Sequence, residues 1–589
     1  MGNAFIYTTV VVSLLIFVYI LPGLSFFPRF ILAPRTAASI PFLSISIVIS
    51  AQYILSLLNQ FNNQNVITLI GILTLTGLYR TYKILSSKNH SWIKKDFIAL
   101  FLIIFSSIPL MIILGLDGFQ HADEIYSWNT WAKKIYFNQT VTFESTISPY
   151  PLALPSFIAF CYQFVGNIDY QLPIKFTFSL IYISTIFILY SFATNKSKAG
   201  VFFITYIFVM LIIGVGYEYK KVYADTLMGG FLVTSLALLI SLSESRLNIN
   251  KNISSISILI ASVLLISTAS LTKQGAMPWS IIIYPILAYV VIYKNIDIPK
   301  PIRLTLVIPI LAPILWYLIG GKGFNGNSGV IGRSMGERNY LEQLLYGFNE
   351  SFINHPFILF FMIIVFMILF KKTNFEKIII STGIFLSTIL ILLFGAYETN
   401  RLYLHMILLG WLVIFAYGNN FSKYKTVYKL NQIGNSFYTY TLIGFLFIFW
   451  SISSLDYKLK INKPVTNILD GREVQANWVI GKNGAEQYRT ILKSRMGLWA
   501  VNSHVWGIYY GIDNFYRGQN LSSTDINSIA KTLLREKIGW IYSNNDSMQR
   551  LQDYCPKSVK KIKTADNTYN QTLYKISPDI INYCIKKQK

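Results

Sequence analysis

The sequence contains little charge. Asp, Glu, Lys and Arg make up only 13% of its 589 residues, whereas about a quarter is usual for a soluble domain. Most of the chain consists of apolar runs of roughly 17 to 23 residues separated by short polar loops, and each run can cross a hydrocarbon core of about 30 Å as a helix. This composition argues against a soluble globular protein and predicts a polytopic membrane protein.

Other features are also absent or scarce. No basic segment precedes the first apolar run, Phe5 to about Leu21, so we interpret that run as a retained helix. No Gly-Lys-Ser/Thr phosphate loop supports an ATP-driven transporter. Of the three cysteines, Cys555 and Cys584 could form a disulfide in an oxidising exterior compartment, and Cys161 is expected to be buried and inert.

The apolar runs predict about fourteen transmembrane helices in an all-α polytopic protein. Residues 151–166 form a short run with two prolines, so we expect an interfacial or partly inserted helix there rather than a span. The expected spans are 4–23, 37–58, 65–82, 97–115, 172–193, 199–217, 226–243, 253–271, 277–293, 303–320, 356–370, 378–396, 402–417 and 436–455.

The formal net charge of +25 could indicate nucleic-acid binding, but its distribution favours a membrane orientation signal instead. Every second loop is basic, and the positive-inside rule places these loops in the cytoplasm. They contain Arg29, Arg35, Arg80, Lys83, Lys88, Lys94, Lys95, Lys196, Lys198, Arg246, Lys251, Lys294, Lys300, Arg303, Lys371, Lys372, Lys377, Lys423, Lys425 and Lys429. The loops between them are predicted to be exterior, as is the N-terminus, and contain Asp117, Asp123, Glu124, Glu144, Glu218, Asp225, Glu337, Glu342, Glu350 and Glu398.

Three regions are predicted along the chain: N-terminal transmembrane helices (1–96), a transmembrane core (97–456) with an exterior acidic loop (116–170), and a small exterior α/β domain (457–589). In the last region, "TDINSIAKTLLREKIGWIYSN" predicts a helix capped by Thr524 or Ser523, followed by a strand through Trp540 and Ile541. "GLWAVNS" and "TLYKIS" predict further strands.

The exterior stretch "HADEIYSW" is the first candidate site. One carboxylate of Asp123 and Glu124 could act as a general base toward a hydroxyl while the other orients a helix, a cation or the substrate. Trp128 and Trp131 are suited to the boundary between water and lipid. The alternative is an acidic and aromatic interface belt without chemistry.

Several charged residues lie at the exterior ends of later spans. Asp225 opens one span, which simple helix capping also explains. Lys273 ends another, where a lysine can snorkel or bind phosphate. Arg401 and His405 are four residues apart on one helix face, and either Glu398 or a lipid phosphate could be the partner of the arginine.

Together these residues favour a substrate with a phosphate at the headgroup level and a tail in the bilayer, such as a lipid-phosphate-linked sugar. An O-antigen polymerase or ligase is the enzyme alternative, although such enzymes depend on exterior arginines and histidines. A flippase or transporter is the alternative from another class. Transport favours charges at mid-bilayer depth and repeated halves, and neither is evident in the sequence.

The motifs resemble those of GT-C class membrane glycosyltransferases, the group that includes protein O-mannosyltransferases and the aminoarabinose transferase of lipid A. The similar stretches lie between residues 97 and 456. In order, they are "ADEIYSW", "SPYPLALP", "YADTLMGGF", "LTKQGAMP" and "ETNRLYLHMI". The chain differs from the better-known members in having four spans before the acidic loop instead of one.

The resemblance implies transfer of a monosaccharide, with inversion, from a polyprenyl-phosphate donor to an envelope glycan or glycolipid. It also implies a bacterial inner-membrane location with the site facing the periplasm or exterior. Asp117 lies close enough to compete for the role of base, and a divalent metal stays open because no full ligand set is visible. The implied roles are general base for Asp123, its orienting neighbour for Glu124, acceptor support for Asp225, donor-phosphate binding for Lys273, Arg401 and His405, and substrate positioning for Trp128 and Tyr150.

Overall fold

A computed structural model of the chain separates into two compact units, each of which is described by itself. The first unit comprises Met1–Leu116 and Asn138–Lys458, and the second comprises Asp117–Phe137 and Leu459–Lys589. The structure describes residues 2–26, 35–86, 99–105, 107–108, 128–140, 151–168, 170–193, 222, 224–244, 251–295, 300–319, 339–354, 356–370, 375–393, 403–417, 497–500, 515–516, 526–535, 538–543, 545–564 and 572–587.

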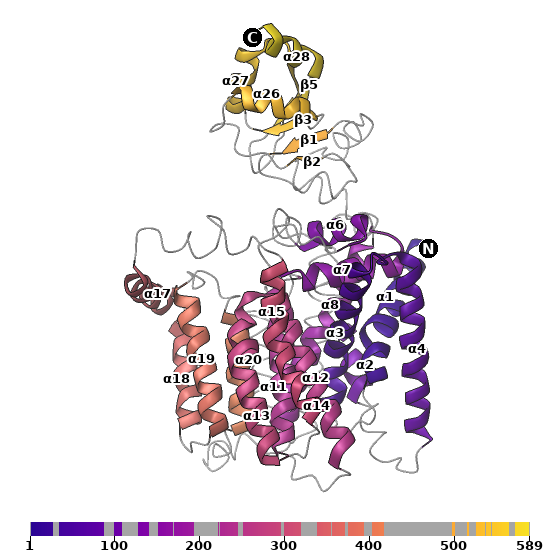
Figure 1. Cartoon of the computed structure of the whole chain (residues 1–589), viewed down its shortest axis with the longest axis vertical. Coiled ribbons are helices and arrows are strands. Elements are labelled where there is room, and N and C mark those ends of the chain that lie inside the picture. The colour runs from indigo at the N-terminus through magenta and orange to yellow at the C-terminus, as the bar shows by residue number, and fades with distance from the viewer. Residues whose placement is uncertain are drawn as a thin grey trace, which may run out of the picture. The chain divides into compact units, whose positions relative to one another are not determined.

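The first unit is a helical bundle (Figure 1). Its elements are α1 (Gly2–Ser13), η1 (Leu14–Ile20), α2 (Leu21–Phe26), α3 (Arg35–Leu57), α4 (Asn63–Leu85), α7 (Ala153–Val165), α8 (Gln171–Ala193), α11 (Ala224–Glu244), α12 (Lys251–Thr272), η4 (Gln274–Ala276), η5 (Trp279–Ile283), α13 (Tyr284–Asn295), α14 (Lys300–Arg303), η6 (Leu304–Val307), α15 (Ile308–Ile319), α17 (Tyr340–Asn354), α18 (Pro356–Phe370), α19 (Phe375–Leu393) and α20 (Leu404–Tyr417).

Six helices in the described ranges are long and apolar enough to cross a membrane. They are Thr8–Phe26, Arg35–Leu57, Ala224–Leu242, Ser255–Thr272, Gln274–Ile292 and Phe375–Leu393. The expected fold class, a helical integral membrane protein with a small C-terminal α/β part, is confirmed. The total of fourteen spans stays a prediction, because the expected spans 199–217 and 436–455 lie outside the described residues.

The helices of the bundle run between two distinct ends. Figure 1 shows α14, a short helix within an expected cytoplasmic basic loop, at one end and α7 and α17 at the other. Lys83 in the last turn of α4 and Lys251 at the start of α12 belong to the same basic series. We call the end that contains α14 the basic end.

Helix α11 is the central helix of the bundle and is packed against α3, α8, α12, α13 and α20. The pair Gly229 and Gly230 makes this packing possible. A Cβ atom on Gly230 would lie 2.6 Å from Cζ of Phe42 in α3, and one on Gly229 would lie 3.1 Å from Cδ1 of Leu408 in α20. An added Cβ at Gly230 would force a shift and one at Gly229 would require Leu408 to move by a few tenths of an ångström, so the glycines allow two helices to contact α11 closely.

The short segment expected at the interface is α7, and the expected helix is confirmed. Its residues from Ala153 to Gln163 are buried, and the helix packs against α3, α4 and α12. It ends at Gly166, whose φ of 75° is the left-handed conformation that glycine adopts without strain. The Asn63 amide at the start of α4 donates a hydrogen bond to the Gln163 carbonyl. Packing inside the protein therefore stabilises this short helix.

Arg35, expected to be an orientation signal in a basic loop, is buried at the start of α3. Its Nε donates to Ser191 Oγ of α8 at 3.1 Å and its Nη1 donates to Ser241 Oγ of α11 at 2.8 Å. The guanidinium carbon lies 3.5 Å from the centre of the Phe192 ring. Both serines donate in turn to carbonyls of their own helices. Arg35 therefore connects three helices at the basic end, a role beyond orientation.

The second unit contains a five-stranded mixed sheet with the strand order β2-β1-β3-β5-β4. Strand β1 is parallel to β2 and β3, whereas β5 is antiparallel to β3 and β4. The expected helix and three expected strands are confirmed as α26, β1, β3 and β5, whereas the cap residues 523 and 524 lie outside the described residues. The elements are α6 (Thr130–Asn138, whose last residue belongs to the first unit), β1 (Gly497–Ala500), β2 (Phe515–Tyr516), α26 (Ile526–Arg535), β3 (Ile538–Ser543), α27 (Asn545–Tyr554), β4 (Val559–Thr564), β5 (Thr572–Ile576) and α28 (Pro578–Lys587).

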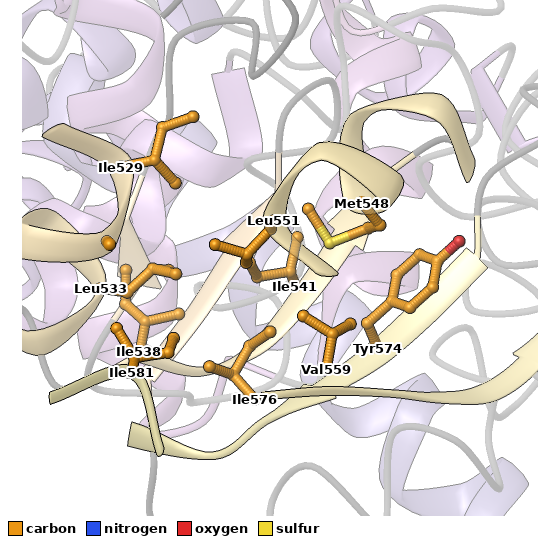
Figure 2. Packing of buried hydrophobic residues seen from close by; sticks show 11 residues of the cluster. Ile529, Leu533, Ile538, Ile541, Met548, Leu551, Val559, Tyr574, Ile576 and Ile581 are labelled. Atoms are coloured by element: carbon orange, nitrogen blue, oxygen red, sulfur yellow. The ribbon is translucent and has the colours of Figure 1, made fainter. Parts of the chain in front are cut away.

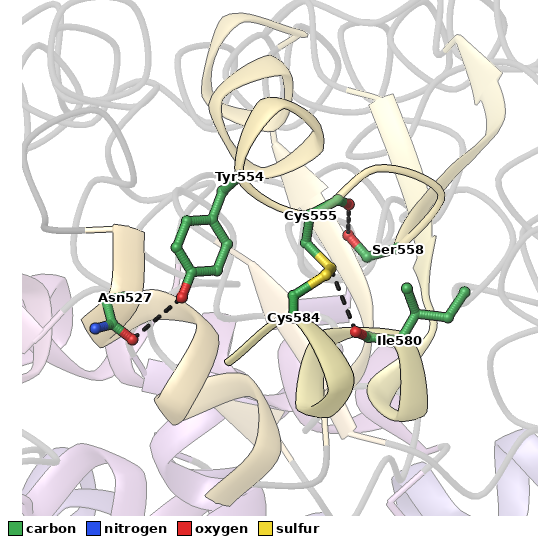
Figure 3. The surroundings of a disulfide bond; sticks show 6 residues. All are labelled: Asn527, Tyr554, Cys555, Ser558, Ile580 and Cys584. Atoms are coloured by element: carbon green, nitrogen blue, oxygen red, sulfur yellow. Dashed lines mark hydrogen bonds between the residues drawn. A yellow bond between two sulfur atoms is a disulfide. The ribbon is translucent and has the colours of Figure 1, made fainter. Parts of the chain in front are cut away.

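A hydrophobic core lies between the sheet and α26, α27 and α28 (Figure 2). It includes Leu533, Ile541, Leu551 and Ile576, each at most 1% exposed. Cys555 after α27 and Cys584 in α28 form the expected disulfide, with a Cα–Cα distance of 5.8 Å (Figure 3). Closing a loop of 29 residues stabilises a fold by about 3 to 4 kcal/mol in the chain-entropy estimate. Cys161 in α7 is a free and buried cysteine, as expected.

Candidate active site

Three residues predicted from separate motifs come together in the first unit. Lys273 Nζ donates a hydrogen bond to Asp225 Oδ1 at 2.5 Å, and the same two groups form an ion pair. The side chain of Asp225 is 5% exposed and that of Lys273 is 14% exposed. His405 is buried beside them, in contact with the segments that carry both residues. We call Asp225, Lys273 and His405 the polar cluster.

The end of helix α12 determines the position of Lys273. The α12 helix ends at Thr272, and Lys273 adopts an extended backbone with φ −159° and ψ 150° before the turn η4. The amide of Ala276 donates to the Lys273 carbonyl at 3.2 Å, which closes that turn. The helix interruption directs the lysine side chain toward the first turn of α11, where Asp225 lies.

His405 lies between α11 and η4. A Cβ atom on Gly275 would lie 3.7 Å from His405 Cε1, and one on Gly229 would lie 3.6 Å from His405 Cβ. Gly229 is four residues after Asp225 on the same helix, and Gly275 is two residues after Lys273. Positions four apart share one face of a helix, so His405 of α20 lies against the two segments that carry the ion pair.

The backbone adds positive potential to the polar cluster. Asp225 is in the first turn of α11 and His405 is in the first turn of α20, so two helix N-termini converge here. Each helix N-terminus carries roughly half a positive charge and exposes N–H groups. An ammonium group has three N–H donors, and the bond to Asp225 uses one of them. These groups are suited to an anion such as a phosphate.

The polar cluster lies at the end of the bundle opposite the basic end. Lys251 starts α12 and Asn295 ends α13, each about 20 residues and hence about 30 Å of helix away from the cluster. Both of those helix ends adjoin loops of the basic series. A site at this end therefore faces away from the side that the positive-inside rule assigns to the cytoplasm.

The other predicted site residues are not members of the polar cluster. Asp117, Asp123, Glu124, Tyr150 and Arg401 lie outside the described residues, so their proposed roles stay predictions. Trp128 belongs to the second unit, where its ring makes an edge contact with Trp131 at 5.2 Å between ring centroids. Trp128 is buried, as a ring in a packed aromatic pair would be.

Sequence reasoning missed the apolar and backbone parts of the site. Met228 packs against η4, with its Sδ 3.3 Å from a Cβ placed on Gly275. Tyr403, two residues before His405, has its hydroxyl 2.6 Å from Ser351 Oγ in α17. The spacing of Asp225, Met228 and Gly229 indicated that they share one face of a helix. It did not indicate which residues of other helices contact that face.

The sequence analysis left open whether the protein requires a divalent metal ion. Within the described ranges, no group of three or more His, Cys, Asp and Glu side chains is arranged to hold a metal ion. The acidic stretch from Asp117 to Glu124 is outside those ranges, so the metal requirement stays a question for that loop.

The fold defines the chain as an integral membrane protein, and the polar cluster lies at one end of its helical bundle. No family model matches the chain, and no curated protein matches it. Among solved structures it is similar to ArnT from Cupriavidus metallidurans, crystallised bound to undecaprenyl phosphate. The match has 12% sequence identity, covers 82% of this chain and 98% of that chain, and has a TM-score of 0.47. Few residues are shared at this identity, so the chemistry must be inferred from the side chains of this chain.

Proposed function

We propose that the protein is a membrane glycosyltransferase. It transfers a monosaccharide, with inversion, from a polyprenyl-phosphate-linked donor to an envelope glycan or glycolipid acceptor. The site faces the periplasm or exterior of a bacterial cytoplasmic membrane. The observation that supports the proposal is the convergence of Asp225, Lys273 and His405 at the end of the bundle opposite the basic loops.

The polar cluster is the proposed site for the donor phosphate. Lys273 has N–H donors beyond the one that binds Asp225, and the N-termini of α11 and α20 favour an anion nearby. Arg401, four residues before His405 in the sequence, would add a second cation for the phosphate. Positive groups fixed beside the phosphate stabilise the negative charge that it gains as it leaves.

Asp225 has a positioning role in this proposal. Its ion pair holds the Lys273 ammonium at one place in the absence of substrate, and its burial at a helix N-terminus keeps the carboxylate fixed. This adds to the acceptor-side role that the sequence resemblance implies. A preorganised lysine loses less side-chain entropy when the phosphate binds.

The acceptor side is assigned to the acidic loop. The acceptor hydroxyl oxygen forms a bond to the anomeric carbon while the bond from that carbon to the phosphate oxygen breaks. The hydroxyl proton passes to Asp123, the proposed general base, and Glu124 orients the acceptor. Trp128 and Tyr150 would position the substrate at the membrane surface. The phosphate leaves with the polyprenyl chain, so the reaction needs no nucleotide.

The experiment uses a deletion strain that expresses wild-type protein, Asp123→Asn or the matched control Asp117→Asn. Mass spectrometry of the surface glycans identifies the sugar and acceptor as a missing monosaccharide mass in the deletion strain. We expect Asp123→Asn to reproduce that loss while the protein remains in the membrane, and Asp117→Asn to restore the mass.

Full restoration by Asp123→Asn would overturn the proposed mechanism. Loss of chain length alone, without loss of a monosaccharide, would instead identify a polymerase.

A further inference from the structure

Helix α17 has a buried face, an exposed apolar face and an exposed face that carries its acidic residues. Gln343, Gly347 and Ser351, spaced four residues apart, are buried on the face toward the bundle. A second face carries Leu341, Leu345, Phe348 and Phe352, which are 65%, 61%, 53% and 60% exposed. A third face carries Glu342, Asn349 and Glu350, and it also includes Tyr346 and Ile353, which are 38% and 63% exposed. At 100° per residue these three sets occupy successive sectors of one helix.

The face toward the bundle is firmly attached. Gly347 lies against the end of α19, where an added Cβ would be 2.6 Å from the Leu392 carbonyl oxygen. Ser351 Oγ is 2.6 Å from the hydroxyl oxygen of Tyr403. The helix start is closed by a capping box, in which the amide of Glu342 donates to Asn339 Oδ1 at 2.9 Å and the amide of Asn339 donates to Glu342 Oε2 at 3.0 Å.

This arrangement is the reverse of a helix on a soluble protein, whose apolar stripe faces the core. Here the small and polar residues face the protein and the apolar stripe faces away from it. A water-facing polar face beside a wide apolar face is typical of a helix that lies in the plane of a membrane interface. The exposed stripe therefore requires an apolar partner outside the bundle.

The neighbouring helices indicate which partner this is. Figure 1 shows α17 beside the ends of α18 and α19, and it packs against both. These two helices expose Ile363, Met367 and Phe385, each more than half exposed, as the lipid-facing side of a membrane bundle must. The apolar stripe of α17 continues that lipid-facing surface at the level where α18 begins and α19 ends.

We propose that α17 is a membrane-interface helix: the stripe Leu341, Leu345, Phe348 and Phe352 contacts lipid acyl chains in the leaflet at the polar-cluster end. Its polar face, with Glu342 and Asn349, lies toward water. Through Ser351 and Tyr403 the helix is attached to the start of α20, which carries His405. The lipid leaflet thereby fixes the height of the segment that brings His405 to the polar cluster. This inference requires only that the bundle is in a bilayer, and it stands apart from the proposed function.

Site-directed spin labelling of the full-length protein in phospholipid liposomes tests the inference. Phe348→Cys and Asn349→Cys are a matched pair, because both positions are exposed on one helix turn but belong to different faces. The native cysteines interfere little, since Cys161 is buried and the other two form a disulfide. Labelled wild-type protein gives the background signal.

We expect the label at 348 to collide often with oxygen, which concentrates in the bilayer, and rarely with a water-soluble nickel chelate. The label at 349 should show the reverse, and a label at Phe352→Cys should agree with the one at 348. Equal access of the chelate to 348 and 349 would overturn the inference. Spin–spin broadening at 348 that disappears on dilution with unlabelled protein would also overturn it, because the stripe would then contact a second copy of the chain.

Discussion

Arg35 and Lys273 are two cations of low exposure that lie toward opposite ends of the bundle, and their surroundings differ. Arg35 at the basic end is held by serines from two helices and by the Phe192 ring, and it is 6% exposed. Lys273 at the other end is paired with one carboxylate, and its side chain is 14% exposed. The arginine is fixed from several directions, whereas the lysine ends a broken helix and has donors left for a ligand. A cation of the first kind holds helices together, and one of the second kind is suited to binding.

The largest expected effect concerns the ion pair of Asp225 and Lys273. We expect Lys273→Asp alone to reduce sugar transfer about 100- to 1000-fold, as loss of one preorganised stabilising group does. The double variant Asp225→Lys with Lys273→Asp restores an ion pair with reversed direction. The double variant should recover the thermal unfolding temperature in detergent but not the transfer activity. The lysine would then be attached to α11, so its ammonium group would no longer occupy the position that it has in the wild type. Recovery of transfer by the double variant would reduce the pair to a structural contact.

The second prediction concerns Arg35. Arg35→Ala removes two charge-assisted hydrogen bonds and a cation–π contact, so we expect a loss of about 2 to 4 kcal/mol in the free energy of unfolding. Arg35→Lys is the matched control, because it keeps the orienting charge but not the planar fork that reaches Ser191 and Ser241. We expect Lys to recover little of the loss, measured by thermal unfolding, while the transfer rate per folded molecule stays unchanged. Full recovery by Lys would return Arg35 to the role of an orientation signal alone.

The smallest expected effect concerns the contact of α3 with α11. Gly230→Ala places a methyl group against Phe42 and should cost about 1 to 3 kcal/mol by overpacking. Gly71→Ala in α4 is the matched control, since nothing lies within 4 Å of the added atom. Unfolding temperatures of the two variants, measured side by side, should differ with Gly71→Ala the more stable. Equal temperatures would mean that α11 and α3 can separate without loss.

Where the structure describes an expected span, its position was predicted from the sequence to within a few residues, whereas α17 was not expected. Length and hydropathy define a membrane span, and Asp225, Lys273 and His405 were each assigned correctly to a helix end. Their association could not be predicted, because hydropathy fixes the depth of a residue but not the rotation of its helix. Asp225 and Lys273 are 48 residues apart, and only the packing of α11 on α12 decides that they meet.

Arg35 and α17 show two further limits. A basic residue in a short loop fits the positive-inside pattern whether it is exposed or buried, so the connecting role of Arg35 left no separate signal. For α17 a signal existed: the apolar residues at 341, 345, 348 and 352 and the Asn339–Glu342 capping pair are written in the sequence. The acidic residues of the segment led to its interpretation as an exterior loop, so the helix was not predicted.

The measurement that tests the central claim most directly is the affinity for undecaprenyl phosphate of the full-length protein in lipid nanodiscs. Wild type is compared with Lys273→Gln and with the matched control Lys83→Gln, which removes an exposed lysine of the basic series. We predict that Lys273→Gln weakens binding by about tenfold, or about 1.4 kcal/mol, and that Lys83→Gln leaves the affinity unchanged. Unchanged affinity of Lys273→Gln, or an equal loss in both variants, would contradict a phosphate site at the polar cluster.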